Sequence, residues 1–125
     1  MRALLVTLLL PLLTACAPKL VVNWSFANVE DGYDHNNRVD VYVGEALMGS
    51  SSVKPETTPN SVTVKLPKGT TEARVVNMAQ YEGKWEEHTI VNEYSIDCVW
   101  EGPIKPSGRT ELNLVFDLDQ GTIVQ

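Results

Sequence analysis

Apolar and polar residues alternate along most of the chain from Lys19 onward, with a period of two rather than 3.6. Between Leu20 and Phe26, for example, every second residue is large and apolar. Each such run can bury one face and leave the other in water, as the strands of an antiparallel sheet do. The predicted strands cover residues 20–26, 39–43, 62–66, 72–81, 84–91, 94–101 and 112–118.

Glycine, proline and asparagine punctuate these runs and mark the turns between strands. Glu82-Gly83 has the sequence of a hairpin tip, and Asn92-Glu93 is a candidate for another. Frequent turns between about seven short strands predict an all-β fold, an antiparallel β-sandwich of the immunoglobulin-like or prealbumin-like kind. Closure of the strands into a barrel is the alternative.

One apolar face of each run supplies the predicted core. Cys98 is expected there as a small buried hydrophobe; the alternative is a catalytic thiol paired with His88 or His35, although no cysteine-hydrolase signature surrounds it. The face is hardest to assign over residues 72–79, where two successive valines are both apolar. The predicted core residues are Leu20, Val22, Val41, Val43, Val62, Val64, Val75, Ile96, Cys98, Leu112, Leu114 and Phe116.

Residues 1–16 differ in character from the rest of the chain. Arg2 is followed by an apolar run of roughly ten residues, too short to span a bilayer as a stable helix. The run ends in Leu13-Thr14-Ala15-Cys16, which resembles the lipobox of bacterial lipoprotein precursors. The resemblance implies that residues 1–15 are a signal peptide that is removed, and that Cys16 is acylated and anchors the protein to a membrane. An ordinary secretory signal with an incidental cysteine is the alternative.

The same resemblance implies a location in the bacterial cell envelope. Ala17 follows Cys16 where an aspartate would favour retention, so the sorting behaviour of Gram-negative lipoproteins points to the outer membrane. Residues 16–19 form a short tether whose extended length is only about 10 Å. One end of the single domain, residues 20–125, is therefore expected to sit close to the bilayer.

Composition narrows the range of partners. The 10 basic and 16 acidic residues give a net charge of −6, which argues against nucleic acid and anionic lipid headgroups. Once Cys16 carries lipid, Cys98 has no partner in the chain, so no disulfide framework is expected. The sequence contains no phosphate loop, zinc-ligand spacing or serine nucleophile motif, and it predicts neither a cofactor nor an enzyme.

Two turn-rich segments carry a second resemblance. Residues 39–51 and 62–69 contain a strand, two spaced glycines, and the turn Pro67-Lys68-Gly69 before a further strand. In this they resemble PEGA-type and carboxypeptidase-regulatory-type sandwich modules, although a polar insertion, residues 50–60, stands where those modules have a proline. Such modules are mostly non-catalytic surface or interaction domains, so the resemblance implies no active-site residues.

The loop of residues 30–37 is rich in side-chain oxygens, which are the ligands that calcium prefers. Asp31 and Asp34 are the candidate calcium ligands, with Asp40 on the next strand as a possible addition. The loop lacks the spacing of an EF-hand, and aspartate, asparagine and glycine also favour plain turns. A turn without a metal is the alternative.

Three aromatic residues are candidates for ligand binding: Tyr81, Trp85 and Trp100. A tryptophan just after a hairpin tip, with carboxylates beside it, could stack on a sugar ring; the alternative is that Trp85 caps the core. Glu86 and Glu87 do not form a glycosidase pair, because adjacent residues of a strand point to opposite faces.

These features support a non-catalytic, membrane-anchored interaction or accessory module that binds another envelope protein. The main alternative is a lipoprotein that binds a glycan or another small ligand through the three aromatic residues. A further alternative is a hydrolase inhibitor that inserts a stiff loop such as Ser51–Asn60 into its target.

Overall fold

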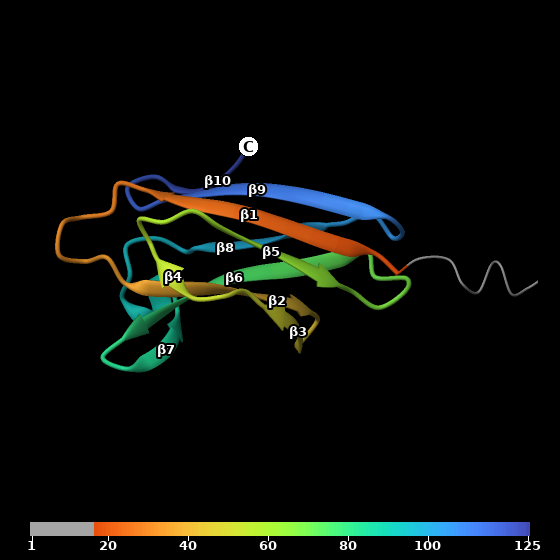
Figure 1. The fold of residues 1–125 in the computed structure, drawn as a ribbon, viewed down its shortest axis with the longest axis horizontal. Helices are drawn as coiled ribbons and strands as arrows, with labels where there is room; N and C mark the ends of the chain where they lie inside the picture. The colour runs from red at the N-terminus through yellow and green to blue at the C-terminus, as the bar shows by residue number, and fades with distance from the viewer. Residues whose placement is uncertain (1–16) are drawn as a thin grey trace, which may run out of the picture.

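The computed structural model of the protein describes residues 17–125, so the predicted signal peptide, residues 1–15, and Cys16 lie outside the described residues. Two β-sheets pack face to face, which confirms the predicted sandwich (Figure 1). The described part of the chain forms ten strands, three more than predicted, because several are short. They are β1 (Lys19–Ala27), β2 (Asn36–Val43), β3 (Ala46–Ser50), β4 (Lys54–Pro55), β5 (Asn60–Lys65), β6 (Glu72–Tyr81), β7 (Lys84–Glu87), β8 (Val99–Pro103), β9 (Arg109–Asp117) and β10 (Gly121–Val124).

The first sheet has the order β10-β9-β1-β5. Its pairs are antiparallel except for β1 with β9, which run parallel from Lys19 opposite Arg109 to Ala27 opposite Asp117. The purely antiparallel arrangement predicted from the sequence is therefore wrong at this pair. The chain enters β9 from β8 in the other sheet, and a strand that arrives by such a crossing is not bound to the antiparallel direction of a hairpin.

The second sheet has the order β3-β2-β6-β7, with β4 paired to β2 and β8 paired to β6. The hairpin between β6 and β7 turns at Glu82 and Gly83, as predicted. Both residues have positive φ, 51° and 80°, which is the backbone that a two-residue turn of this hand requires.

The core lies between the two sheets and contains ten of the twelve predicted residues as buried side chains. The other two, Val43 and Val62, are partly buried and pack against it. Over residues 72–79, Val75 faces the core, whereas Val76 is fully buried on the opposite face of β6, where it lies across from Asp40 and Val99. Both valines are therefore buried, but on different sides of the sheet.

Two predicted strand ranges are wrong in their extent. The run 84–91 pairs only as far as Glu87, and the run 94–101 pairs only from Val99. Between them the chain makes a 3₁₀ turn, Ile90–Asn92, closed by Glu93 at φ 71° and by the Asp97 carboxylate, which accepts a hydrogen bond from the Ile90 amide. The alternation of Ile96 and Cys98 reflects burial, not sheet pairing.

The first described residues are fixed to the body of the domain. The Pro18 carbonyl accepts a hydrogen bond from the Leu66 amide (2.8 Å), and the Lys19 amide donates to the Gly108 carbonyl (2.9 Å). The N-terminal end of β1 thus lies at one end of the sandwich, and the loop that leaves β1 toward β2 lies at the other (Figure 1). Within residues 17–125, no helix has the length and apolar character to cross a membrane.

Candidate functional site

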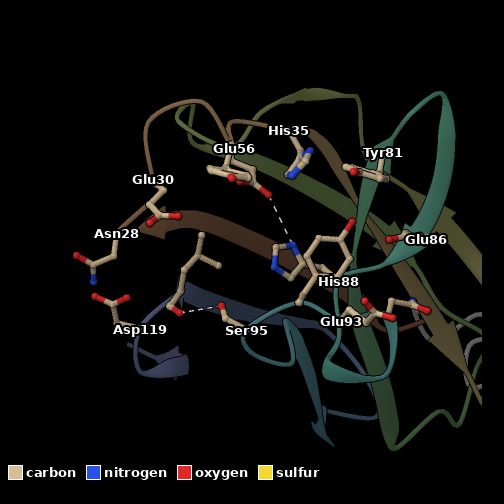
Figure 2. A pocket seen from close by; sticks show the side chains of 14 residues that line it. Asn28, Glu30, His35, Glu56, Tyr81, Glu86, His88, Glu93, Ser95 and Asp119 are labelled. Atoms are coloured by element: carbon tan, nitrogen blue, oxygen red, sulfur yellow. Dashed lines mark hydrogen bonds and ion pairs between the residues drawn. The ribbon is translucent and has the colours of Figure 1, made fainter.

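A cavity of about 630 Å³ opens at the end of the sandwich where β1 finishes, away from the N-terminal end of the domain (Figure 2). Its volume lies in the range of small-molecule sites. It is bounded by the loop between β1 and β2, the chain after β4, the β6–β7 hairpin, and the turns that follow β7 and β9. The lining residues are Asn28, Glu30, Tyr33, His35, Glu56, Tyr81, Glu86, His88, Asn92, Glu93, Tyr94, Ser95, Leu118 and Asp119.

Two titratable side chains, Glu56 and His88, form the deepest part of this cavity. Glu56 is 1% exposed and His88 is 3% exposed, and the Glu56 Oε2 lies 3.6 Å from the His88 Nδ1. That distance is longer than a hydrogen bond. Neither carboxyl oxygen of Glu56, nor the His88 Nδ1, has a hydrogen-bond partner among the described residues. Buried polar groups of native proteins are rarely left in this state.

Burial sets the protonation of this pair. It raises the pKa of Glu56 from 4.5 to about 7, and the nearby negative charge of Asp34 raises it further, against a lowering contribution from the backbone at His35. Burial lowers the pKa of His88 from 6.5 to about 4, with a further lowering contribution from His35. Between about pH 4 and pH 7 the pair therefore holds its proton on the carboxyl group, and the imidazole is neutral.

Aromatic rings surround the pair. The Tyr94 ring lies 4.2 Å from the His88 ring, centroid to centroid, and Phe26 contacts the other side of His88 at 5.9 Å. His35 meets Tyr81 and Tyr94 edge to face at 5.8 and 6.3 Å. Figure 2 shows Glu56, His35 and Tyr81 in a row along one side of the cavity, with His88 below them. The His88 side of the pair is therefore packed among aromatic rings.

The charged residues of the lining have one sign. Five of its described residues are acidic, and none is a lysine or an arginine. Burial, and then the nearby Glu86 carboxylate, raise the pKa of the Tyr94 phenol above its ordinary range. The cavity is therefore an acidic, aromatic-lined recess.

Cys98 lies near the pair but in the core. It is fully buried, its amide donates to the His88 carbonyl (2.8 Å), and burial with the charges of Glu56 and Asp97 raises the pKa of its thiol. A thiol with a raised pKa is a poor nucleophile. This geometry matches the prediction of a buried small hydrophobe.

The structure does not bring Tyr81, Trp85 and Trp100 to one surface. Tyr81 is half exposed at the rim of the cavity. Trp85 pairs with Gln80 on the outer face of the second sheet, where the Arg38 guanidinium lies 4.6 Å from the centre of its ring. Trp100 pairs with Val75 on the inner face and packs against the core, so close to Gly102 that a Cβ there would lie 2.8 Å from its ring.

The two candidate calcium ligands lie in the exposed loop between β1 and β2. Asp34 accepts hydrogen bonds from the amide and hydroxyl of Thr57, at 3.2 and 2.8 Å. Asp40 is buried elsewhere, between Arg38 at 3.0 Å and the Ser50 hydroxyl at 2.7 Å. Over residues 17–125, no three His, Cys, Asp or Glu side chains are grouped in a way that could hold a metal ion.

The two glutamates after Trp85 part as expected. Glu86 lines the cavity, while Glu87 lies on the outer face of the sheet, 3.4 Å from Arg74. The Ser51–Asn60 segment is tied to the domain rather than projecting from it: it pairs with β2 through β4, and the Glu56 amide donates to the His35 carbonyl.

The sequence did not single out Glu56. It stands in a polar, proline-flanked segment that is typical of a solvated loop, and its burial depends on residues far away along the chain. His88 and His35 were considered only as partners for Cys98. The only available signal was the position of the two histidines of the sequence: His35 stands just before the predicted strand 39–43, and His88 lies within the predicted strand 84–91.

Comparison with known proteins finds likeness in structure alone. No family model matches the chain, and no curated protein matches it. Among solved structures, it is similar to Serratia marcescens Lip, a membrane-bound component of the type VI secretion system, with 11% identity, a TM-score of 0.51, and coverage of 88% of this chain and 97% of that one. It is also similar to the type VI secretion lipoprotein TssJ1 from Pseudomonas aeruginosa, with 11% identity, a TM-score of 0.47, and coverage of 87% and 97%.

The similarity to Lip shows the fold, and it extends over most of both chains rather than one motif. The resemblance to PEGA-type and carboxypeptidase-regulatory-type modules finds no counterpart in these comparisons. It stays a likeness of two sequence segments.

Proposed function

We propose that this protein is a lipid-anchored, non-catalytic accessory component of a protein complex in the bacterial cell envelope, held in the outer membrane through Cys16. The observation that supports the proposal is the very short segment between Cys16 and the folded domain. Two residues after Cys16 the chain is already hydrogen-bonded to the sandwich, through Pro18 to Leu66 and through Lys19 to Gly108. A domain on so short a connection stays beside the membrane surface, within reach of other membrane-proximal proteins.

We further propose that the complex is a secretion machine of the type VI kind. The support is the fold shared with Serratia marcescens Lip over nearly the full length of both chains. At 11% identity the fold is shared without its sequence, so the partner has to be found by experiment.

The test is crosslinking in living cells of the full-length lipoprotein, followed by affinity capture in detergent and mass spectrometry. The expected result is one dominant envelope protein in the captured material. Cys16→Ser is the matched control: it should abolish incorporation of labelled palmitate and move the protein out of the membrane fraction. Capture of the lipoprotein alone would contradict the accessory role, and palmitate incorporation by Cys16→Ser would contradict the anchor.

The second candidate function is binding of a small ligand, which the cavity supports. Of the three aromatic residues predicted to bind a ligand, Tyr81 lines it, and Trp85 and Trp100 do not.

A further inference from the structure

The cavity combines three features that a purely structural recess does not need. It has a buried carboxyl group without a hydrogen-bond donor, a neutral buried imidazole without a partner at Nδ1, and a wall of aromatic and acidic side chains. None of these features lowers the free energy of folding, and all of them favour the binding of a cation.

Three buried side chains of the lining have unsatisfied polar atoms: Glu56 and His88 provide acceptors, and the Tyr94 hydroxyl can donate or accept. Ionised Glu56 offers only acceptor oxygens, and the His88 Nδ1, with its proton on the other nitrogen, is an acceptor too. Because Oε2 and Nδ1 are 3.6 Å apart, one donor atom can lie within hydrogen-bonding distance of both. A primary ammonium group carries three N–H donors, which matches the two carboxyl oxygens and the imidazole nitrogen.

The side walls of the cavity also favour a positively charged ligand. Tyr81, Tyr94 and His35 line the cavity, and aromatic rings attract cations through their negative faces. Glu86 adds a carboxylate near the rim. With no basic residue among the described lining residues, an anionic ligand would meet uncompensated repulsion.

We propose that this cavity binds an organic cation with a primary ammonium or guanidinium head, which pairs with Glu56 and His88 beneath the rings of Tyr94 and His35. The source of the cation is either a free amine or a basic side chain of a peptide, since the chemistry is shared. The site is independent of the proposed accessory role, because the evidence for it lies wholly in this chain.

The proposal has a pH signature. A cation pairs with the carboxylate, so binding strengthens as Glu56 ionises. The titratable groups that face Glu56 are His88 from the end of β7, Asp34 and His35 from the loop between β1 and β2, Tyr94 from the turn after β7, and Cys98 from the segment before β8. Because burial and Asp34 raise the pKa of Glu56 to about 7, affinity should rise between pH 6 and pH 8.

The test is isothermal titration calorimetry of the full lipoprotein in detergent micelles with n-butylammonium chloride, and separately with N-acetyl-lysine amide. Sodium butyrate and n-butanol serve as anionic and neutral probes of the same size. Saturable binding of either amine, with none of butyrate, is expected. Glu56→Gln should weaken it by about tenfold or more, as the loss of a charge-assisted hydrogen bond does, and should remove its pH dependence.

Two further variants guard the interpretation. Glu86→Gln at the rim should weaken binding by a smaller factor, and it removes no buried group. Glu72→Gln, at the opposite end of β6 from Tyr81, is the matched control and should bind like the parent protein. Stronger binding of n-butylammonium would indicate a free amine as the ligand, and stronger binding of N-acetyl-lysine amide would indicate a peptide side chain. Equal binding of butanol, or undiminished amine binding by Glu56→Gln, would overturn the proposal. Failure of both amines to bind at pH 8 would do the same.

Discussion

Two buried polar clusters lie on either side of β4, and they are built in opposite ways. In the first, which we call the Asn37 cluster, the Asn37 Oδ1 accepts hydrogen bonds from the Trp24 Nε1 (3.2 Å) and the Asn77 Nδ2 (2.8 Å), and its Nδ2 donates to the Lys54 carbonyl (2.8 Å). In the second, Glu56 and His88 face each other at 3.6 Å without a hydrogen bond.

The comparison shows that Asn37 stabilises the fold through its hydrogen bonds, whereas Glu56 is buried without any side-chain hydrogen bond. Asn37 joins three elements, and both its oxygen and its nitrogen are hydrogen-bonded, so its burial is compensated. Glu56, two residues along the chain from Lys54, is just as buried, and its carboxyl oxygens are uncompensated. Natural proteins retain such conflicts mainly where a function requires them.

The largest effect should come from breaking the Asn37 cluster. Asn37→Ala leaves a buried indole N–H, an amide N–H and a carbonyl without partners, and we expect a loss of about 4 kcal/mol in the free energy of unfolding. Urea denaturation followed by tryptophan fluorescence measures it. Asn113→Ala, which removes an exposed amide that pairs with Asn23, is the control and should cost less than about 0.5 kcal/mol. If both variants lost a similar amount of unfolding free energy, the hydrogen bonds of Asn37 would not be a main source of stability.

The second effect concerns the pH dependence of stability. The folded pKa of Glu56 is raised, so the stability it contributes is present below pH 4.5 and is lost as pH rises through about 7. The folded pKa of His88 is lowered, so its contribution is present above pH 6.5 and is lost as pH falls through about 4. Between pH 4.5 and 6.5 the two dependences oppose each other, because folding transfers a proton from the imidazole to the carboxyl group.

Single substitutions should separate the contributions of Glu56 and His88 to the pH dependence of stability. Relative to the parent protein, Glu56→Gln should gain about 3 kcal/mol of stability as pH rises from 4 to 8. His88→Gln should gain a similar amount as pH falls over the same range. Unfolding free energies measured across the range test both, with Glu72→Gln as the reference. Two relative dependences of the same sign would show that Glu56 and His88 do not exchange a proton on folding.

The smallest effect divides the Asn37 cluster itself. Asn77→Ala removes one hydrogen bond to Asn37, but it also removes the Asn77 Oδ1, a buried acceptor that has no hydrogen-bond partner among residues 17–125. The expected loss is about 2 kcal/mol, half that of Asn37→Ala. The same urea titration measures it, and a loss as large as that of Asn37→Ala would mean that the two amides act as one unit.

The sandwich could be predicted because its determinants are local. The period-two alternation from Leu20 to Phe26 and the positive-φ turn at Glu82-Gly83 both depend on neighbours in sequence, and both were confirmed. The parallel pairing of β1 with β9 could not be predicted, because no local signal states which strand lies beside the first one. The stretch 94–98 shows the same limit: its alternation gave burial correctly, but not the absence of a paired strand.

The floor of the cavity was beyond sequence reasoning for a similar reason. Glu56 stands among threonines and prolines, where a solvated carboxylate is the ordinary expectation. Its burial arises because β4 joins the edge of β2 and the Glu56 amide reaches the carbonyl of His35, which is 21 positions earlier. Polar residues that become buried through such distant contacts leave no periodic pattern.

The position of β1 has a mechanical consequence for a protein pulled by its N-terminus. The strand leaves the tether at Lys19 and is held on one side by β9 along all of its length and on the other by β5 as far as Trp24. Its backbone hydrogen bonds run across the strand, so a force along β1 loads them together in shear instead of opening them one at a time. If the domain were pulled between the membrane and a partner at its far end, β1 would therefore be the part that best resists unfolding.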